Sequence, residues 1–300
     1  MVKPIDFSGA FTALVTPFRD DRLDLAALDS LVDFQLRGDI HGVVPCGTTG
    51  ESPTLDRDEF RAVVSAVVAR VAGRVPVIAG TGTNSTRETI DRTRYAEQAG
   101  ADGCMLVMPY YNKPTQGGLL QHVRAVHDAT QRPLVLYNIP GRSVVDLHLD
   151  TLTEIARACP RVVAVKEATG NVLRSQQIVA TLGDRLAVLS GDDALTLGIL
   201  ACGGRGVISV TSNVAPRAVQ SVVRRFHEGA LAEARRGHMA LMPLHDALFV
   251  ESNPGPVKAA LHAMGLLAPE LRLPLVWPAP RSVDLVLSAM TTAGVPQVSG

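Results

Sequence analysis

One amine in this sequence stands where it could act as a nucleophile. Lys166 ends the apolar run at residues 162–165, which is typical of a strand buried on both faces of a parallel sheet. Burial lowers the pKa of an amine, so that the neutral form can attack a carbonyl carbon near pH 7 and form an imine. A lysine that merely reaches solvent from a strand end has the same local sequence. The residues elsewhere in the chain decide between these interpretations.

Further polar side chains follow other apolar runs of the same kind. Residues 47–52 carry successive amides and hydroxyls between two glycines, an arrangement that suits a carboxylate. Tyr110 and Tyr111 follow a second run, and Tyr137 and Arg142 lie at the end of a third. A phenol can carry the protons of imine chemistry, and a guanidinium binds a carboxylate through two hydrogen bonds. Taken singly, each could instead be an ordinary turn, a helix cap or interface packing.

Eight such apolar runs recur along the chain, with amphipathic helical segments between them. This alternation predicts an α/β fold, a (β/α)8 TIM barrel, in preference to an open doubly wound sheet. The chemistry of such barrels collects on the loops that follow the strands, which is where the polar residues described above fall. The runs lie at residues 11–15, 42–45, 76–79, 103–108, 134–138, 162–166, 186–189 and 207–210.

After the eighth run the sequence contains helical segments and no strand candidate. We therefore expect two domains, a (β/α)8 catalytic barrel over residues 1–228 and a small C-terminal helical domain over residues 229–300. The last ten residues, from Thr291, are expected to fray.

Composition argues against several classes of protein. The 29 basic and 29 acidic residues balance, which gives no support to a nucleic-acid or anionic-membrane partner. No apolar run has the length of a membrane span and the first seven residues have no apolar signal core, so we expect a cytoplasmic protein. The four cysteines and eight histidines lack paired spacings, which favours reduced, buried thiols and disfavours a metal site.

Three ordered stretches resemble the dihydrodipicolinate synthase and N-acetylneuraminate lyase family of pyruvate-dependent class I aldolases. They are residues 47–52, residues 137–142 and residues 165–170 around the lysine. Three motifs in this order with the lysine are highly specific for the superfamily. The similarity continues through residues 189–193, 206–213 and 249–258, so it spans nearly the whole chain.

Two positions favour the synthase branch of this family. The lyases that act on larger sugar acids usually have a serine at the position of Thr48 and lack an arginine equivalent to Arg142. The resemblance therefore implies the condensation of pyruvate with L-aspartate 4-semialdehyde in the diaminopimelate and lysine pathway, by a lyase of the carbon–oxygen, hydro-lyase type. It implies a homotetramer and neither a metal nor an organic cofactor.

The resemblance also implies roles for individual residues. Lys166 would form the Schiff base with pyruvate, and Tyr137 would shuttle protons. Thr48 would link Tyr137 to Tyr111, which would reach in from a neighbouring subunit. The positions implied for substrate binding are Thr49, Arg142, Ile208 and Gly191.

Lysine-inhibited members of the family bind the effector at a subunit interface. Arg57 and Phe60 stand where histidines occur in sensitive examples, and Arg57 would place a cation near a cationic effector. We therefore expect weak or absent feedback inhibition. The candidate effector site comprises Ser52, Asn84, Glu88 and Tyr110.

Two other functions remain open at this stage. One is another pyruvate-dependent aldolase or lyase that uses the same lysine with a different aldehyde, such as an N-acetylneuraminate lyase-like or sugar-acid aldolase. The other is a barrel without catalytic activity that binds a partner or serves as a structural protein.

Overall fold

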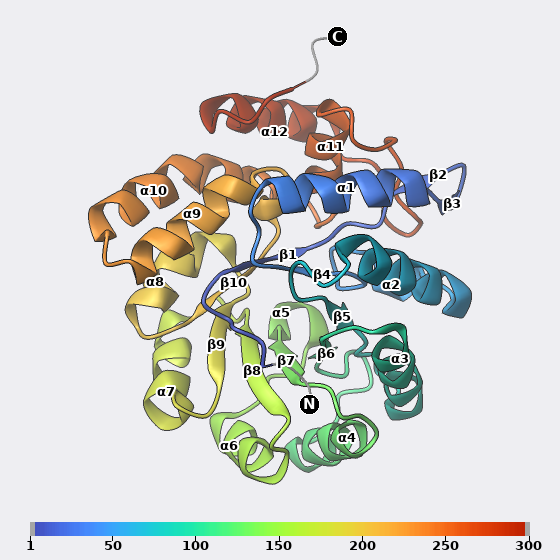
Figure 1. Ribbon diagram of the computed structural model, residues 1–300, viewed down its shortest axis with the longest axis vertical. Helices are drawn as coiled ribbons and strands as arrows, with labels where there is room; N and C mark the ends of the chain where they lie inside the picture. The colour runs from blue at the N-terminus through green and yellow to red at the C-terminus, as the bar shows by residue number, and fades with distance from the viewer. Residues whose placement is uncertain (1–3, 298–300) are drawn as a thin grey trace.

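The chain folds around a closed barrel of parallel strands (Figure 1). The computed structural model describes residues 4–297. Within these residues the order of the eight-stranded sheet is β4-β1-β10-β9-β8-β7-β6-β5, and a parallel bridge between Val43 and Val77 joins its two ends. The strands are β1 (Ala10–Ala13), β4 (Gly42–Val44), β5 (Ile78–Gly80), β6 (Gly103–Val107), β7 (Leu134–Asn138), β8 (Val162–Glu167), β9 (Ala187–Ser190) and β10 (Gly206–Ser209). Each predicted run overlaps one of these strands, so the prediction of a (β/α)8 barrel is confirmed.

Helices alternate with these strands and form the outer ring of the barrel (Figure 1). Several begin at side chains that accept hydrogen bonds from free backbone amides, as Asp24, Ser85 and Asn171 do. Asp56 and Glu59 form a reciprocal capping box at the start of α2. The helices are α1 (Leu25–Arg37), α2 (Arg57–Val71), α3 (Thr86–Ala99), α4 (Gln116–Asp128), α6 (Leu149–Ala158), α7 (Val172–Leu182), α8 (Thr196–Ala201) and α9 (Pro216–His227).

Three further helices complete the chain: α10 (Leu231–Ala247), α11 (Gly255–Ala263) and α12 (Pro280–Thr292). Figure 1 shows α10 beside α9, with α11 and α12 at the top of the view. Leu244, Val257 and Val286 belong to the same hydrophobic cluster as the barrel helices. The helical C-terminal region is therefore present as expected, and its boundary after residue 228 stays a prediction.

The end of the chain differs from the sequence-based expectation. Helix α12 continues to Thr292, and Val295 is buried against the hydrophobic cluster, so fraying from residue 291 is wrong for these positions. The apolar side chain of Val295 holds the segment in place. Residues 298–300, which were part of the same expectation, lie outside the described residues.

Several short elements in the loops were not predicted. They are the antiparallel pair β2 (Phe18–Arg19) and β3 (Arg22–Leu23), the one-turn helix α5 (Pro140–Ser143), and the 3-10 turns η1 (Ser52–Thr54), η2 (Asp193–Leu195) and η3 (Thr211–Asn213). Segments of two to four residues are too short to show hydrophobic periodicity, which explains why the sequence pattern missed them.

The barrel interior is packed by alternate residues of the strands. On β7 and β8 the inward positions are occupied by Val135 and Ala164, and they recur two residues later at Tyr137 and Lys166. The alternation thus places a phenol and an amine at the carboxyl-terminal end of the interior. The inner cluster comprises Phe7, Phe11, Ala13, Val44, Ile78, Met105, Val135, Tyr137, Ala164, Leu189 and Ile208.

Candidate active site

Lys166 and Tyr137 are neighbours across two adjacent strands. They are direct partners in the register of β7 and β8, and partners in a parallel pair point to the same face of the sheet. The Lys166 Nζ lies 4.0 Å from the centroid of the Tyr137 ring. Both side chains are almost fully buried, with exposed fractions of 5% and 4%. The structure therefore holds one amine against one phenol in an enclosed space, as nucleophilic attack on a carbonyl requires.

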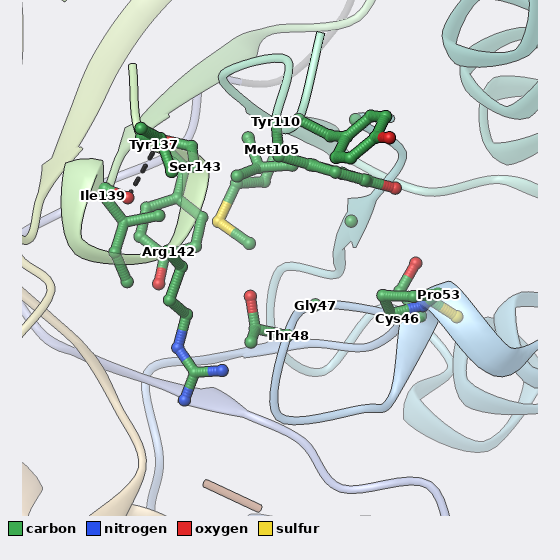
Figure 2. Close-up of a pocket in the computed structure, with 16 residues that line it drawn as sticks. Cys46, Gly47, Thr48, Pro53, Met105, Tyr110, Tyr137, Ile139, Arg142 and Ser143 are labelled. Carbon is green, nitrogen blue, oxygen red and sulfur yellow. Dashed lines mark hydrogen bonds between the residues drawn. The ribbon is translucent and has the colours of Figure 1, made fainter. Parts of the chain in front are cut away.

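A cavity of about 340 Å³ opens at the carboxyl-terminal mouth of the barrel. Its walls come from the ends of β5, β6 and β7 and from the loops that follow β4, β5, β6 and β7. Figure 2 shows Tyr137, Met105, Thr48 and Arg142 directed toward the same space. The cavity thus combines an apolar wall with a few polar groups, as is usual for a small-molecule site.

The loop at residues 47–52 turns tightly after β4. The amides of Gly50 and Ser52 donate to the carbonyl of Gly47 over 3.1 and 3.3 Å, and the amide of Glu51 donates to the carbonyl of Thr48 over 3.1 Å. Thr48 faces the cavity. These internal hydrogen bonds fix the backbone of the loop that carries Thr48.

Thr49 differs from Thr48 in its surroundings. Its side chain is buried, and its Oγ1 accepts a hydrogen bond of 2.9 Å from Nδ2 of Asn253. The backbone carbonyl of Asn253 accepts a hydrogen bond of 3.3 Å from Nη2 of Arg142. Asn253 therefore links two of the expected substrate-binding residues. Sequence reasoning missed it as a site residue, since its partners lie more than a hundred positions away.

Ile208 and Gly191 occupy the ends of the remaining strands at this side of the barrel. Ile208 on β10 is buried in the inner cluster. The amide of Gly191 donates to the Glu167 carbonyl over 2.8 Å, and a Cβ at this position would lie 2.5 Å from the Cβ of Ala168. A side chain at position 191 would thus disturb the segment that follows Lys166.

Tyr111 stands apart from the other expected catalytic residues. Its side chain is 86% exposed and its backbone has a φ of +72°, in the left-handed region. The residue also borders the cavity. The single chain therefore leaves this phenol in solvent at the edge of the mouth.

Glu167 follows Lys166 on β8, and its side chain links the carboxyl-terminal ends of β7 and β8. The residue is buried, and its carboxylate accepts hydrogen bonds from Nδ2 of Asn138 over 3.2 Å and from the Thr169 amide over 2.9 Å. Burial raises the pKa of this carboxyl, while the two hydrogen bonds and the Arg174 guanidinium at 3.8 Å oppose the change. The alternation of the strand, which points Glu167 away from the interior, is the sequence signal for this supporting role.

The residues of the candidate effector site lie on neighbouring elements. Glu88 forms an ion pair of 2.7 Å with Arg92, whose Nη1 also donates to the Ser52 hydroxyl over 3.1 Å. Asn84 accepts a hydrogen bond through its backbone carbonyl, and Tyr110 borders the active-site cavity. A second cavity of about 380 Å³ lies beside α2 and α3 and is lined in part by Arg57, Phe60, Glu88 and Arg92.

Among residues 4–297, no group of three or more histidine, cysteine, aspartate or glutamate side chains is placed to hold a metal ion. Over the same residues no helix is long and apolar enough to cross a membrane.

A closed (β/α)8 barrel with an amine, a phenol and a guanidinium at its carboxyl-terminal end has the architecture of a barrel enzyme. The chain belongs to the dihydrodipicolinate synthetase family, whose sequence model matches residues 6–289. This confirms the resemblance found in the sequence.

Individual relatives agree with the family assignment. The 4-hydroxy-tetrahydrodipicolinate synthase of Sorangium cellulosum is 58% identical over 274 residues, which cover 91% of each chain. Dihydrodipicolinate synthase from Aquifex aeolicus has a similar structure, with a TM-score of 0.95, 43% identity, and coverage of 97% of this chain and 99% of that chain. A structure described as the first monomeric dihydrodipicolinate synthase variant matches with a TM-score of 0.95 and 41% identity. The match covers 97% of this chain and 99% of that chain.

Proposed function

We propose that this protein condenses pyruvate with L-aspartate 4-semialdehyde to give 4-hydroxy-tetrahydrodipicolinate, in the diaminopimelate branch of lysine biosynthesis. The observation that carries the proposal is the pairing of Lys166 with Tyr137 at the mouth of the barrel, with 4.0 Å between the amine and the phenol ring. The names of the relatives support this choice of substrates over another aldehyde.

The first step is the formation of an imine. The Nζ of Lys166 attacks C2 of pyruvate, and the oxygen of that carbon leaves as water. Tyr137 donates the proton that this departure needs and then recovers it, with Thr48 and a Tyr111 from a neighbouring subunit as the path to solvent. The backbone of residues 47–52, helped by Thr49, Gly191 and the backbone near Ile208, would hold the pyruvate carboxylate.

The second step forms the carbon–carbon bond. Loss of a proton from the pyruvate methyl group gives an enamine, whose carbon attacks the aldehyde of the second substrate. The amino group of that substrate then attacks the imine carbon and displaces Lys166, which closes the ring and frees the enzyme. One water is released for each product, which is the chemical basis for the hydro-lyase description.

Arg142 would bind the carboxylate of the aldehyde substrate. Its guanidinium stands in the cavity wall, where the Asn253 carbonyl orients it; among residues 4–297 no other hydrogen bond occupies its donors, which a ligand could therefore use. Loss of a charged hydrogen bond of this kind costs about 1.5 to 3 kcal/mol. Arg142→Ala should therefore raise the KM for the aldehyde by about ten- to a hundredfold and leave imine formation with pyruvate intact.

The decisive assay is pyruvate consumption with and without L-aspartate 4-semialdehyde, coupled to the next reductase of the pathway. We expect strong dependence on this aldehyde. If the aldehyde has no effect while borohydride still traps pyruvate on Lys166, the chemistry stands and the acceptor is wrong. Sugar-acid aldehydes are then the substrates to try.

A homotetramer and a cytoplasmic location belong to the same proposal. The exposure of Tyr111 at the cavity edge supports an assembly in which a second copy covers it. The four cysteines are all free, as is usual in a reducing compartment.

A further inference from the structure

An ion pair without any contact to solvent lies beneath the loop at residues 47–52. It joins the carboxylate of Glu51 to the Nζ of Lys258, and the exposed fraction of both side chains is zero. Lys258 also donates a hydrogen bond of 3.1 Å to the Glu270 carbonyl, and its Nζ lies 4.4 Å from the centroid of the Phe18 ring. The amine thus contacts a carboxylate, a backbone carbonyl and an aromatic ring.

The other oxygen of Glu51 is also occupied. It accepts a hydrogen bond of 3.0 Å from the backbone amide of Arg272. The backbone of Glu51 has a φ of +54°, a left-handed conformation that costs a residue with a Cβ some free energy. The contacts of its carboxylate with Lys258 and with the Arg272 amide hold Glu51 in this left-handed conformation, which is unfavourable for the isolated backbone.

Stability alone is a poor explanation for such a pair. Removing two charges from water is costly, and apolar side chains of similar volume often stabilise a core equally well. Burial lowers the pKa of the Lys258 amine and the Glu51 carboxylate opposes that change, which is the signature of this cost. What an ion pair adds is a fixed geometry between the two segments that it joins.

One of these two segments is the loop to which the proposed function assigns the pyruvate carboxylate, and the other packs against it. Glu51 lies two residues after Thr49 and three after Thr48, and its amide donates to the Thr48 carbonyl. Lys258 lies on α11, five residues after Asn253, whose side chain donates to Thr49 Oγ1. The segment at residues 253–258 therefore contacts the loop twice, once at each end.

We propose that Glu51 and Lys258 are positioning residues that fix the loop at residues 47–52 to α11 in the geometry that binds the pyruvate carboxylate. The inference rests on the proposed function, because it names pyruvate as the ligand of this loop. Neither residue touches the substrate. Their effect reaches it through the backbone of Thr48 and Thr49, and it makes the C-terminal helices part of pyruvate binding.

The test compares Glu51→Gln, Lys258→Met and the double variant with the wild type. The pyruvate concentration for half-maximal borohydride trapping and the KM for pyruvate should rise by about tenfold or more in each single variant. The KM for the aldehyde should stay within about threefold, because Arg142 is held by the Asn253 carbonyl and not by the ion pair. The double variant should resemble one single variant, since both break the same contact.

Val126→Ala is the matched control for lost stability. Val126 is fully buried on α4, away from the loop, so the substitution should lower Tm without changing the KM for pyruvate. If Glu51→Gln does not fold, Glu51→Asp keeps the charge on a shorter side chain and should still raise the KM. The rise in the KM for pyruvate should therefore occur in the Glu51 and Lys258 variants and not in Val126→Ala.

Two results overturn the inference, and they are distinguishable. Folded Glu51 variants with a lowered Tm and an unchanged pyruvate KM would show a pair that only stabilises the fold. A wild-type protein that traps no pyruvate would remove the proposed function and the inference with it.

Discussion

At the scale of single residues, the chemistry rests on the register between two strands. The sequence shows Lys166 and Tyr137 at the ends of separate apolar runs, and it predicts that both face the barrel mouth. It does not say that they are direct partners. That follows from the pairing of β7 with β8, which brings the amine to 4.0 Å from the phenol ring.

Tyr137→Phe tests the phenol as a proton carrier. The variant keeps the aromatic ring beside Lys166 and removes only the hydroxyl, so imine formation should slow and kcat should fall by about 10²- to 10⁴-fold. Steady-state kinetics and the rate of borohydride trapping measure the two effects. Tyr95→Phe is the control, because its hydroxyl contacts Ser65 on the outer helices and turnover should not change. Full turnover of the Tyr137 variant would exclude the phenol as the proton carrier.

At the scale of elements, the hydrophobic pattern predicted the strands and long helices because burial imposes periodicity on them. It predicted Thr48, Arg142 and Lys166 as site residues because they follow strands, and the cavity brings the first two together. The contact of Asn253 with Thr49 joins residues 204 positions apart, so no local pattern encodes it. The helix turn that carries Arg142 is likewise too short to leave a periodic signal.

Helix α3 supports the prediction of weak inhibition by lysine. Glu88 is the carboxylate that a cationic effector would need, and Arg92 already pairs with it and with Ser52. Arg57 adds a further positive charge beside the same cavity. We expect little loss of activity at millimolar lysine in the coupled assay. Inhibition at low-millimolar or lower concentrations would contradict this reading of the Arg92 contacts.

The packing of α4 on α3 should make stability depend on pH. His122 is buried against the Thr86 hydroxyl at 2.9 Å, and burial lowers its pKa to about 4. Between about pH 6.5 and 4 the unfolded chain binds a proton that the folded chain does not, so stability falls as the pH falls. Between pH 7 and pH 5 the free energy of unfolding should fall by about 2 kcal/mol.

Chemical denaturation at the two pH values measures the effect. His122→Gln should remove most of this change in the free energy of unfolding between pH 7 and pH 5. His148→Gln, at an exposed histidine, should leave the change in place. An unchanged dependence on pH in the His122 variant would exclude this histidine as its source.

At the scale of the whole molecule, the barrel and the C-terminal helices act as one unit. They share a hydrophobic cluster, and residues 253 and 258 contact the loop after β4. The site is nevertheless incomplete in one respect. Tyr111 stands 86% exposed at the edge of the cavity, which is where the proposed assembly would place a second copy of the chain.

Mixed subunits test whether Tyr111 acts in a neighbouring site. Tyr111→Phe and Lys166→Ala should each be nearly inactive, and random mixing by joint refolding should restore about a quarter of the wild-type activity, because half of the pairs then contain one intact site of two. Sedimentation should give a particle of about four times the chain mass of 31.8 kDa. No recovery of activity in confirmed mixed assemblies would show that Tyr111 does not act across the interface.

The proposed chemistry requires that Lys166 forms an imine with pyruvate. The most direct measurement is incubation of the protein with pyruvate and borohydride, followed by mass spectrometry of the peptides. We expect one reduced pyruvate adduct, on the peptide that contains Lys166, and none in Lys166→Ala. An adduct on another lysine, or full turnover by Lys166→Ala, would contradict it.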